Sequence, residues 1–553
     1  MNRLLIIMMW FFAFCILHFA FSLGPASGAS YSSVHGFPLD DPGLGGRGAC
    51  SYCHATHNAA GGSGTSLWSQ RLVDKVYTIY SSTTLDARPG QPTGSTKLCL
   101  SCHDGTIAPA ATGAPGESPL SASARALLLG ELSVGTDLSD DHPLSFVYGP
   151  EVASADPQIK HPGALAGGPV KLDKNGEMQC TSCHDAHKDS MAHFLVMDNR
   201  GSALCRQCHQ LSGWNASIHA TSTAAVPGSG QYATLADNGC ENCHVQHHAG
   251  SHAWLLISQE EERNCLACHD GTGSQKNVAA DIQKASGHKP DRYLAVHDPK
   301  EDPSRMPMHV ECSDCHNPHA ARQGTVGTLP GGLASVTGVN AAGLPVAAAS
   351  AEYEICFKCH AGTPLSTLGE GAGGEVITRQ VTQTNTRLEF STANPSYHPV
   401  LGPGASNNVP SLTGGLTVNS VIRCSDCHAS DSSSVRGPHG SLFSPLLVRN
   451  YVTGSTASES PSAYALCYGC HSRTSILGDV SFHEHKKHVV DKQAPCSVCH
   501  DAHGTQGSSA NHARLINFDT SVVTANQAGR LEYVSGGCYL RCHGKNHDGN
   551  TGD

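Results

Sequence analysis

Hydrophobic residues are distributed unevenly along the chain, with one long apolar run near the N-terminus. This run covers residues 4–24, follows the positive charge of Arg3, and leads into small residues up to Ala29. A short basic segment, an apolar segment and small residues are typical of a secretory signal peptide, so we predict a signal peptide at residues 1–29 and an exported protein. Because the run is longer than most signal-peptide cores, a retained membrane anchor is the alternative prediction.

After residue 29 the apolar residues occur in short groups separated by Gly, Ser and Pro. The chain has 59 glycines and 30 prolines, and only 6% of its residues are aromatic and 15% charged. This composition predicts mostly coil with short α-helices and little β structure, with something other than side chains filling the interior. Residues 109–129, 324–351 and 361–392 are predicted to be surface flaps or small hairpins. The second of these contains no charged residue and is an uncharged insertion.

Cysteines follow one arrangement along almost the whole chain. Of the 25 cysteines, all except Cys15 in the predicted signal peptide form twelve close pairs, and a histidine follows the second cysteine of each. Eleven pairs have the spacing C-x-x-C-H, and the last, "CYLRCH", has one more residue between its cysteines. Numbered as motifs 1 to 12, the pairs are Cys50 and Cys53, Cys99 and Cys102, Cys180 and Cys183, Cys205 and Cys208, Cys240 and Cys243, Cys265 and Cys268, Cys312 and Cys315, Cys356 and Cys359, Cys424 and Cys427, Cys467 and Cys470, Cys496 and Cys499, and Cys538 and Cys542.

C-x-x-C-H is the attachment signature of c-type haem. Within a helical turn the three residues share one face, so two thiols can bond the haem vinyl groups while the imidazole reaches the iron. A disulfide scaffold would not require the histidine, and zinc ribbons use two cysteine pairs for each ion. The array therefore predicts twelve haem c groups. In motif 12 the extra residue moves Cys538 by about 100° around a helical turn, so the backbone must bulge there.

The motifs alternate in character, which indicates a repeat of two motifs. Odd-numbered motifs are followed by a second histidine, as in "CHNPH" ending at His319, whereas even-numbered motifs follow a lead-in such as "EYEIC". In motif 9 an insertion separates the two histidines, as "CHASDSSSVRGPH". We therefore predict six tandem dihaem modules wrapped around a haem stack, at residues 30–130, 131–212, 213–280, 281–392, 393–478 and 479–553.

Each predicted haem requires two axial ligands, and the 35 histidines are enough for two at every motif. The proximal candidates end the motifs: His54, His103, His184, His209, His244, His269, His316, His360, His428, His471, His500 and His543. The distal candidates are the second histidines His57, His187, His247, His319, His439 and His503, and one upstream histidine per module, namely His35, His142, His219, His288, His398 and His488. His297 and His485 are close alternatives to His288 and His488. We expect His161, His193, His252, His309, His512 and His547 at the surface or beside haem propionates.

A second histidine cannot reach the far face of the haem that its own motif holds. We therefore expect it to be the distal ligand of a neighbouring haem, which would tie two haems into one unit. For His319 the predicted neighbour is the haem attached at Cys356 and Cys359.

This layout resembles the doubled C-x-x-C-H family of multihaem c-type cytochromes, above all at "HVECSDCHNPH", "EYEICFKCH" and "HKKHVVDKQAPCSVCHDAHG". The resemblance covers nearly all of the chain after residue 29, and motifs 9 and 12 depart from it. Within this family, the layout resembles that of the long secreted members from metal-respiring bacteria. The resemblance implies an exported protein of the periplasm or outer surface, with redox partner cytochromes or an outer-membrane cytochrome complex as partners.

Bis-histidine ligation leaves the iron no open position, which favours electron transfer over catalysis. The function that we predict is electron transport between a periplasmic donor and an outer-membrane or extracellular acceptor. One alternative is a multihaem reductase of nitrite or a similar small oxyanion, which needs one haem with an open position. Another is a haem filament formed by self-assembly. The net charge of −11 comes without any basic stripe, which excludes nucleic acid as a partner.

Overall fold

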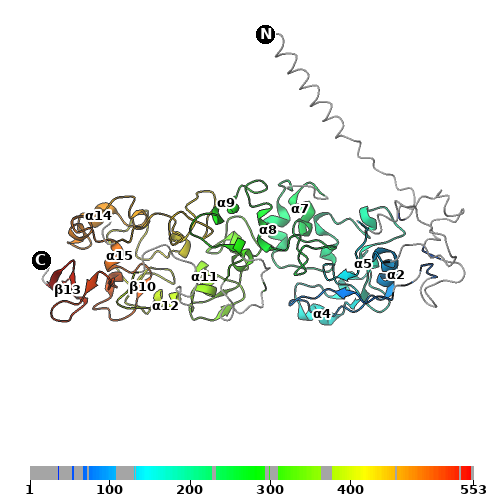
Figure 1. Ribbon diagram of the computed structural model, residues 1–553, viewed down its shortest axis with the longest axis horizontal. Coiled ribbons are helices and arrows are strands. Elements are labelled where there is room, and N and C mark those ends of the chain that lie inside the picture. The colour runs from blue at the N-terminus through cyan, green and yellow to red at the C-terminus, as the bar shows by residue number, and fades with distance from the viewer. Residues whose placement is uncertain are drawn as a thin grey trace, which may run out of the picture.

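The chain is elongated, and its sequence order follows the long axis from one end to the other (Figure 1). Helix α2 (Gly94–His103) lies toward the N-terminal end, and strand β13 (Gly537–Cys542) lies at the C-terminal end. Consecutive parts of the chain are therefore neighbours along the body. The computed structural model describes residues 35, 53–54, 67–70, 72, 74–106, 130, 132–226, 232–292, 298, 309–362, 377–454, 458–534 and 537–549.

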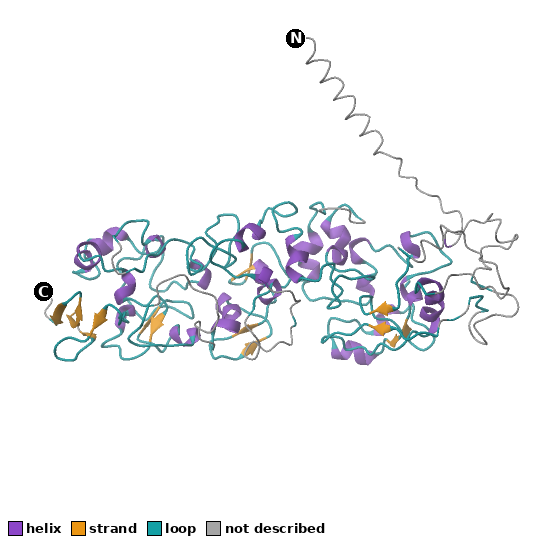
Figure 2. Cartoon of the chain, viewed as in Figure 1, coloured by secondary structure: helices purple, strands orange, loops and turns teal. Residues whose placement is uncertain are grey.

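Helices are short because Gly, Ser and Pro recur between the motifs and interrupt them. The longest helix among the described residues, α2, has ten residues and ends on a motif histidine, and loops and turns make up most of the described chain (Figure 2). The other α-helices are α4 (Pro150–Ala155), α5 (Cys180–Cys183), α6 (Ile218–Thr221), α7 (Leu235–Asn238), α8 (Glu261–Leu266), α9 (Val278–Ile282), α10 (Cys312–Cys315), α11 (Glu352–His360), α12 (Thr386–Glu389), α13 (Ala465–Tyr468), α14 (Arg473–Leu477) and α15 (Cys496–Cys499). Single turns of tighter helix are η4 (Pro162–Leu165), η5 (Ala192–Phe194), η6 (Arg200–Ser202), η7 (Cys205–Gln207), η8 (Trp214–Ala216), η9 (Gly239–Asn242), η10 (Pro290–Arg292), η11 (Gly331–Leu333), η13 (Cys424–Asp426) and η15 (Ala513–Leu515), and η14 (Lys487–Asp491) is a π-helical turn.

Most strands have two residues and pair with one other strand. They are β1 (Thr78–Ile79) with β2 (Asp137–Leu138), β3 (Phe146–Val147) with β4 (Glu177–Met178), β5 (Thr325–Val326) with β6 (Leu329–Pro330), β7 (Gly338–Val339) with β8 (Pro345–Val346), and β9 (Ser396–Tyr397) with β10 (Gly504–Thr505). The β1–β2 pair is parallel and the others are antiparallel. The β5–β6 and β7–β8 hairpins lie within the uncharged insertion of residues 324–351.

The C-terminal end carries a four-stranded antiparallel sheet, which the sequence analysis did not predict. Its order is β11 (Val523–Thr524), β13, β12 (Glu532–Val534), with β14 (Lys545–Asp548) also paired to β13. The sheet holds motif 12, because Cys538 and Cys542 both lie in β13. This motif is therefore in a strand and not in a bulged helical turn.

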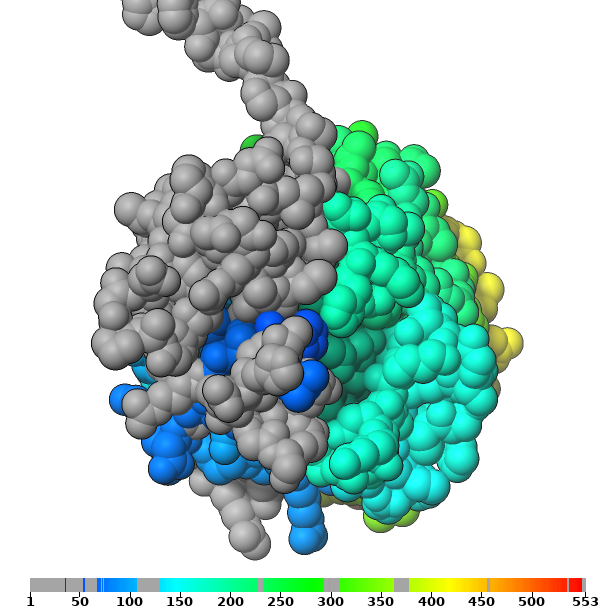
Figure 3. Space-filling view, turned by 90° about the vertical axis from the view of Figure 1, so that its right-hand side faces the viewer, coloured from blue at the N-terminus to red at the C-terminus, as the bar shows by residue number. Residues whose placement is uncertain are grey.

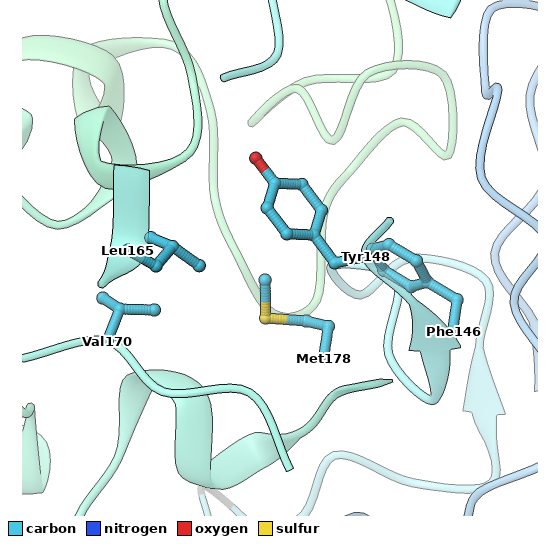
Figure 4. Close-up of a cluster of buried hydrophobic side chains, with 5 residues drawn as sticks. All are labelled: Phe146, Tyr148, Leu165, Val170 and Met178. Atoms are coloured by element: carbon cyan, nitrogen blue, oxygen red, sulfur yellow. The ribbon is translucent and has the colours of Figure 1, made fainter. Parts of the chain in front are cut away.

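The packed side-chain clusters are small. Figure 4 shows one of them, in which Phe146, Tyr148, Leu165, Val170 and Met178 point toward one another from the β3–β4 hairpin and from the region of η4. Phe146 and Met178 are directly opposite in the antiparallel register, so their side chains share one face of the hairpin. Each of the other clusters contains between three and five buried residues. Among the residues that the structure describes, no cluster is large enough to be the core of a chain of this length.

A continuous channel of about 5400 Å³ runs between these clusters. Pockets for one small ligand measure about 300–1,000 Å³, so the channel is far larger than a single binding site. Its lining extends from Tyr80 to His547 and includes every cysteine of motifs 3 to 12. Figure 3 views the molecule from the end that carries its first described segments, where blue segments lie beside cyan and green ones. Within the described ranges, no helix combines the length and the hydropathy needed to cross a bilayer.

A chain produced without haem attachment is expected not to fold cooperatively. Ordering a residue costs about 1–2 kcal/mol, and clusters of three to five residues cannot offset that cost over several hundred residues. The channel would also fill with water in contact with apolar side chains such as Leu256, Val336 and Phe390, which is unfavourable. Thermal unfolding of the haem-free chain, followed by circular dichroism, should show no sharp transition. A cooperative transition would contradict this expectation.

Candidate haem centres

A single helical turn brings the two cysteines and the histidine of most motifs onto one face. In eight motifs the backbone N–H of the motif histidine donates to the carbonyl of the first cysteine, at 2.8–3.0 Å. This is the i to i−4 bond of an α-helix, and residues with that spacing share a face. Motifs 2 and 8 end the longer helices α2 and α11. Cys50 lies outside the described residues.

Hydrogen bonds at Nδ1 orient the motif imidazoles. The Nδ1–H of His184, for example, donates to the backbone carbonyl of His193 at 2.8 Å, and that of His244 donates to Trp254 at 2.7 Å. With Nδ1 occupied, Nε2 is the nitrogen that can bind a metal. The same arrangement occurs for His103 with Leu132, His316 with Gly332, His428 with Pro445, and His500 with Arg514.

The imidazoles face one another in twelve pairs, with ring centres 5.9–6.4 Å apart. The pairs, given with the motif histidine first for motifs 1 to 11, are His54 and His187, His103 and His35, His184 and His247, His209 and His142, His244 and His319, His269 and His219, His316 and His439, His360 and His288, His428 and His503, His471 and His398, and His500 and His485; the twelfth is His488 and His547. Two imidazoles bound to one metal ion from opposite sides, with metal–nitrogen bonds of about 2 Å, have ring centres about 6 Å apart. The donor pairs therefore fit a six-coordinate haem iron.

One rule describes the partners of motifs 2, 4, 6, 8 and 10. The upstream histidine of a predicted module pairs with the histidine of the second motif in the same module, as His219 does with His269 in residues 213–280. Three upstream histidines, His219, His288 and His398, are held by the next predicted module, because the Nδ1–H of each donates to the carbonyl that directly precedes a second histidine, whereas the Nδ1–H of His142 donates to the carbonyl of Pro143. His219 donates to Pro318 at 2.9 Å, and His288 donates to Pro438 at 2.8 Å.

A different rule describes the odd-numbered motifs, and it corrects the sequence-based prediction for His319. The ring centre of His319 lies 6.1 Å from that of His244, whereas His360, in the motif of Cys356 and Cys359, pairs with His288. The second histidine thus reaches back to the first motif of the preceding module, and not forward within its own. His187, His247, His439 and His503 follow the same rule.

Four further sequence-based assignments need comment. His57 lies outside the described residues. His485 and His488, which the sequence offered as alternatives, are both in imidazole pairs. His512 is 7% exposed, so it is not a surface residue, and its Nδ1–H donates to the carbonyl of Ile516 at 3.0 Å. His547, expected at the surface or beside a haem propionate, lines the channel, whereas the proximal candidate His543 is exposed.

Burial keeps most of these imidazoles neutral, which is the form that binds a metal. Desolvation, with a smaller contribution from a nearby imidazole, lowers the pKa values of His209, His360 and His500 to about 4. His247 and His503 differ. Burial lowers their pKa values too, but a buried carboxylate, Asp141 for one and Glu389 for the other, outweighs burial and raises the pKa above the ordinary value.

Thiols of neighbouring modules are in contact at every junction. The thiol of Cys99 hydrogen-bonds to that of Cys180, which lowers the pKa of Cys180 to about 7. The same contact between the first cysteine of an even-numbered motif and the first cysteine of the next motif joins Cys205 to Cys240, Cys265 to Cys312, Cys356 to Cys424, and Cys467 to Cys496. Attachment points of consecutive modules are therefore adjacent along the channel.

Glutamate side chains reinforce two of these junctions. Glu261, four residues before Cys265, accepts hydrogen bonds from the N–H and hydroxyl of Ser313 at 2.8 and 2.6 Å. Glu352, four residues before Cys356, accepts the same two bonds from Ser425 at 2.7 and 2.8 Å. Each serine directly follows the first cysteine of the next motif, so the carboxylate holds two attachment turns together.

Residues 173–211 match the family model described as the doubled CXXCH motif. The match covers motifs 3 and 4 and the residues between them. The motifs imply covalently bound haem c, and proteins that carry them are typically exported. No curated protein matches the chain.

Two axial candidates have a carboxylate at Nδ1 in place of a carbonyl. The Nδ1–H of His247 donates to Asp141 at 2.8 Å, and Asp141 is 2% exposed; the Nδ1–H of His503 donates to Glu389 at 2.9 Å. A carboxylate makes the imidazole a stronger electron donor, and a stronger donor stabilises the oxidised metal. The haems of motifs 3 and 9 are therefore expected to have lower reduction potentials than sites of equal burial with carbonyl partners.

The substitution Asp141→Asn should raise the reduction potential of one haem, because it removes the charge and keeps an acceptor for His247. A tenfold change in the relative stability of two oxidation states is about 59 mV for one electron, and we expect a positive shift of about this size. Spectroelectrochemical titration measures it. The control is Asp198→Asn, since Asp198 is exposed and its carboxylate accepts a hydrogen bond from Tyr232 and not from an axial candidate. An unchanged titration curve for Asp141→Asn would contradict the assignment.

The substitution His319→Ala should open one haem without detaching it, since the thioethers at Cys240 and Cys243 and the ligand His244 remain. Intact mass should be unchanged except for the side chain, one high-spin ferric signal should appear, and the reduced protein should bind carbon monoxide at one site. The control is His248→Ala, because the Nε2–H of His248 donates to the carbonyl of Ser133 at 2.7 Å and does not face a metal site. If both variants remain entirely low-spin, His319 is not a ligand.

Proposed function

We propose that this protein is a c-type cytochrome with twelve bis-histidine haems that conducts electrons along its length. The observation that carries the proposal is the set of twelve imidazole pairs, with ring centres 5.9–6.4 Å apart, in which eleven motif histidines take part. Haem iron supplies one-electron exchange when it is bound at such a site. The surrounding side chains orient the imidazoles, exclude water and set the order of the sites.

The pairing favours electron transfer over catalysis. With an imidazole on each side, a site has no position for a substrate. A reductase of a small oxyanion would need a motif histidine that faces no second imidazole. Each of the eleven C-x-x-C-H histidines in the described chain faces one, so the geometry supports the conduit over the reductase.

The thiol contacts support conduction along the chain. Because the attachment cysteines of consecutive modules touch at all five junctions, the two haems at each junction share an edge region of the channel. The body is elongated, with motif 12 at one end (Figure 1). Electrons that enter at one end would pass through the sites in chain order. An exported chain of this form would link a periplasmic donor to an outer-membrane cytochrome complex or an extracellular acceptor.

The mature holoprotein tests the proposal. Intact mass should correspond to twelve haems, the ferric spectrum should be entirely low-spin, and the reduced protein should bind no carbon monoxide. Mixed with less than one equivalent of a reduced one-electron donor, the protein should share each electron among its haems faster than it exchanges electrons between molecules. Turnover of nitrite or another small oxyanion by the reduced protein would overturn the proposal in favour of the reductase.

A further inference from the structure

The twelfth motif is built on a β-hairpin, unlike motifs 2 to 11. Strand β13 carries both cysteines and pairs with β14 in a register that places Leu540 opposite His547 and Cys542 opposite Lys545. The register is continuous from Tyr539 to Cys542, so no bulge interrupts it. Successive side chains of a strand point to opposite faces, and therefore Cys538, Leu540 and Cys542 share one face.

His543, which follows the second cysteine, does not lie on that face. It and Gly544 form the two-residue turn between β13 and β14, with φ values of 49° and 78°. Positive φ at both positions is typical of the type I′ turn of a tight hairpin. His543 is exposed at the hairpin tip, and the described residues that line the channel include Cys538, Leu540 and Cys542 but not His543. The turn thus directs this imidazole away from the site that the cysteines border.

His547, unlike His543, lies on the face of the hairpin that carries the two cysteines. Side chains directly opposite in an antiparallel pair are on the same face, so His547 shares the face of Leu540 and lies diagonally between the two cysteines. Leu540 is 5% exposed and packs with Val523 and Phe518, while Cys499, Cys538 and Cys542 border the same cluster. The face of the hairpin that carries His547 is therefore the buried face, turned toward motif 11.

A second imidazole faces His547 from across the channel. The ring centre of His488 lies 6.4 Å from that of His547, the same separation as in the pairs of motifs 4, 6 and 10. The Nδ1–H of His488 donates to the carbonyl of Glu484 at 2.8 Å, so its Nε2 is the nitrogen available to a metal. Phe482 stacks against the His488 ring and also contacts Tyr533, the strand neighbour of Cys538. The distal imidazole is thus held in place from the side of the sheet.

We propose that His488 and His547, and not His543, are the axial ligands of the haem attached at Cys538 and Cys542. The inference rests on the proposed haem-carrying function and changes the ligand rule for one site: the proximal histidine comes from the adjacent strand and not from the residue after the second cysteine. The reason is geometric. Successive residues of a strand point to opposite faces, so the residue after Cys542 does not share the face of the two thiols, whereas His547, opposite Leu540 on the neighbouring strand, does.

Two alanine variants of the holoprotein test the proposal, with haem counted by intact mass. His547→Ala should either yield one high-spin haem that binds carbon monoxide when reduced and returns to low spin with added imidazole, or lose one haem. His543→Ala should leave every attached haem low-spin. The matched control is Asn546→Ala, on the same strand β14 but on its opposite face. If His547→Ala keeps twelve haems and all remain low-spin, the proposal is wrong.

A double variant tests whether His488 and His547 bind the same iron, independently of how well each single variant folds. If His488 and His547 bind one iron, His488→Ala opens one haem, and the double variant with His547→Ala still has no more than one altered haem. Two altered haems in the double variant would overturn the pairing. A wild-type mass that corresponds to eleven haems would overturn the site itself. In each case the other eleven haems report separately on the proposed function, because their spectra do not depend on either residue.

Discussion

The structure depends on pairs of imidazoles that come from different parts of the chain. At each odd-numbered motif from 1 to 9, one imidazole follows the cysteines and the other belongs to the next predicted module, as with His244 and His319. At motifs 5, 7 and 9 the carbonyl before that second histidine also accepts the Nδ1–H of an upstream histidine, as Pro318 does from His219. A module therefore completes one site of its predecessor and orients a ligand for another. A predicted module that contains one of these motifs does not supply both imidazoles for both of its sites. The predicted modules are therefore parts of one folding unit.

The same pairing explains why so sparse a set of apolar side chains is sufficient. The described clusters contain three to five residues each, and the channel of about 5400 Å³ separates them. Flat apolar groups bound between imidazoles would pack against Trp214, Leu256 and Phe390, which line that channel. The chain then needs only turns and short helices that hold cysteines and histidines in place. Gly, Ser and Pro suit that task, since loops rather than long helices position the ligands.

The sequence indicated which residues belong to the candidate sites better than it indicated which histidines pair with one another. Cysteines and motif histidines follow from local spacing, because a helical turn fixes their common face. Eleven of the twelve distal candidates also lie in imidazole pairs, and His57 is outside the described residues. The direction of the pairing could not be predicted, because it depends on how modules pack: His319 reaches back to His244, although Cys356, in the same predicted module as His319, is nearer in sequence. The C-terminal sheet was missed because its strands are short and one of them holds a motif that the helical rule assigns to a turn.

The last module shows how local structure can replace the general rule. Elsewhere the first motif of a module takes its second imidazole from the module that follows, but His500 takes His485, from its own module. His485 and His488 are three residues apart on one helical segment, so they lie on nearly the same face and can serve two neighbouring sites. Because His485 pairs with His500, His488 is left to face the hairpin, whose buried face carries His547. Motif 12 lies in a strand and not in a helical turn, and two histidines precede motif 11. These two features belong to one arrangement, because each supplies an axial ligand that the pattern of the other motifs would leave missing.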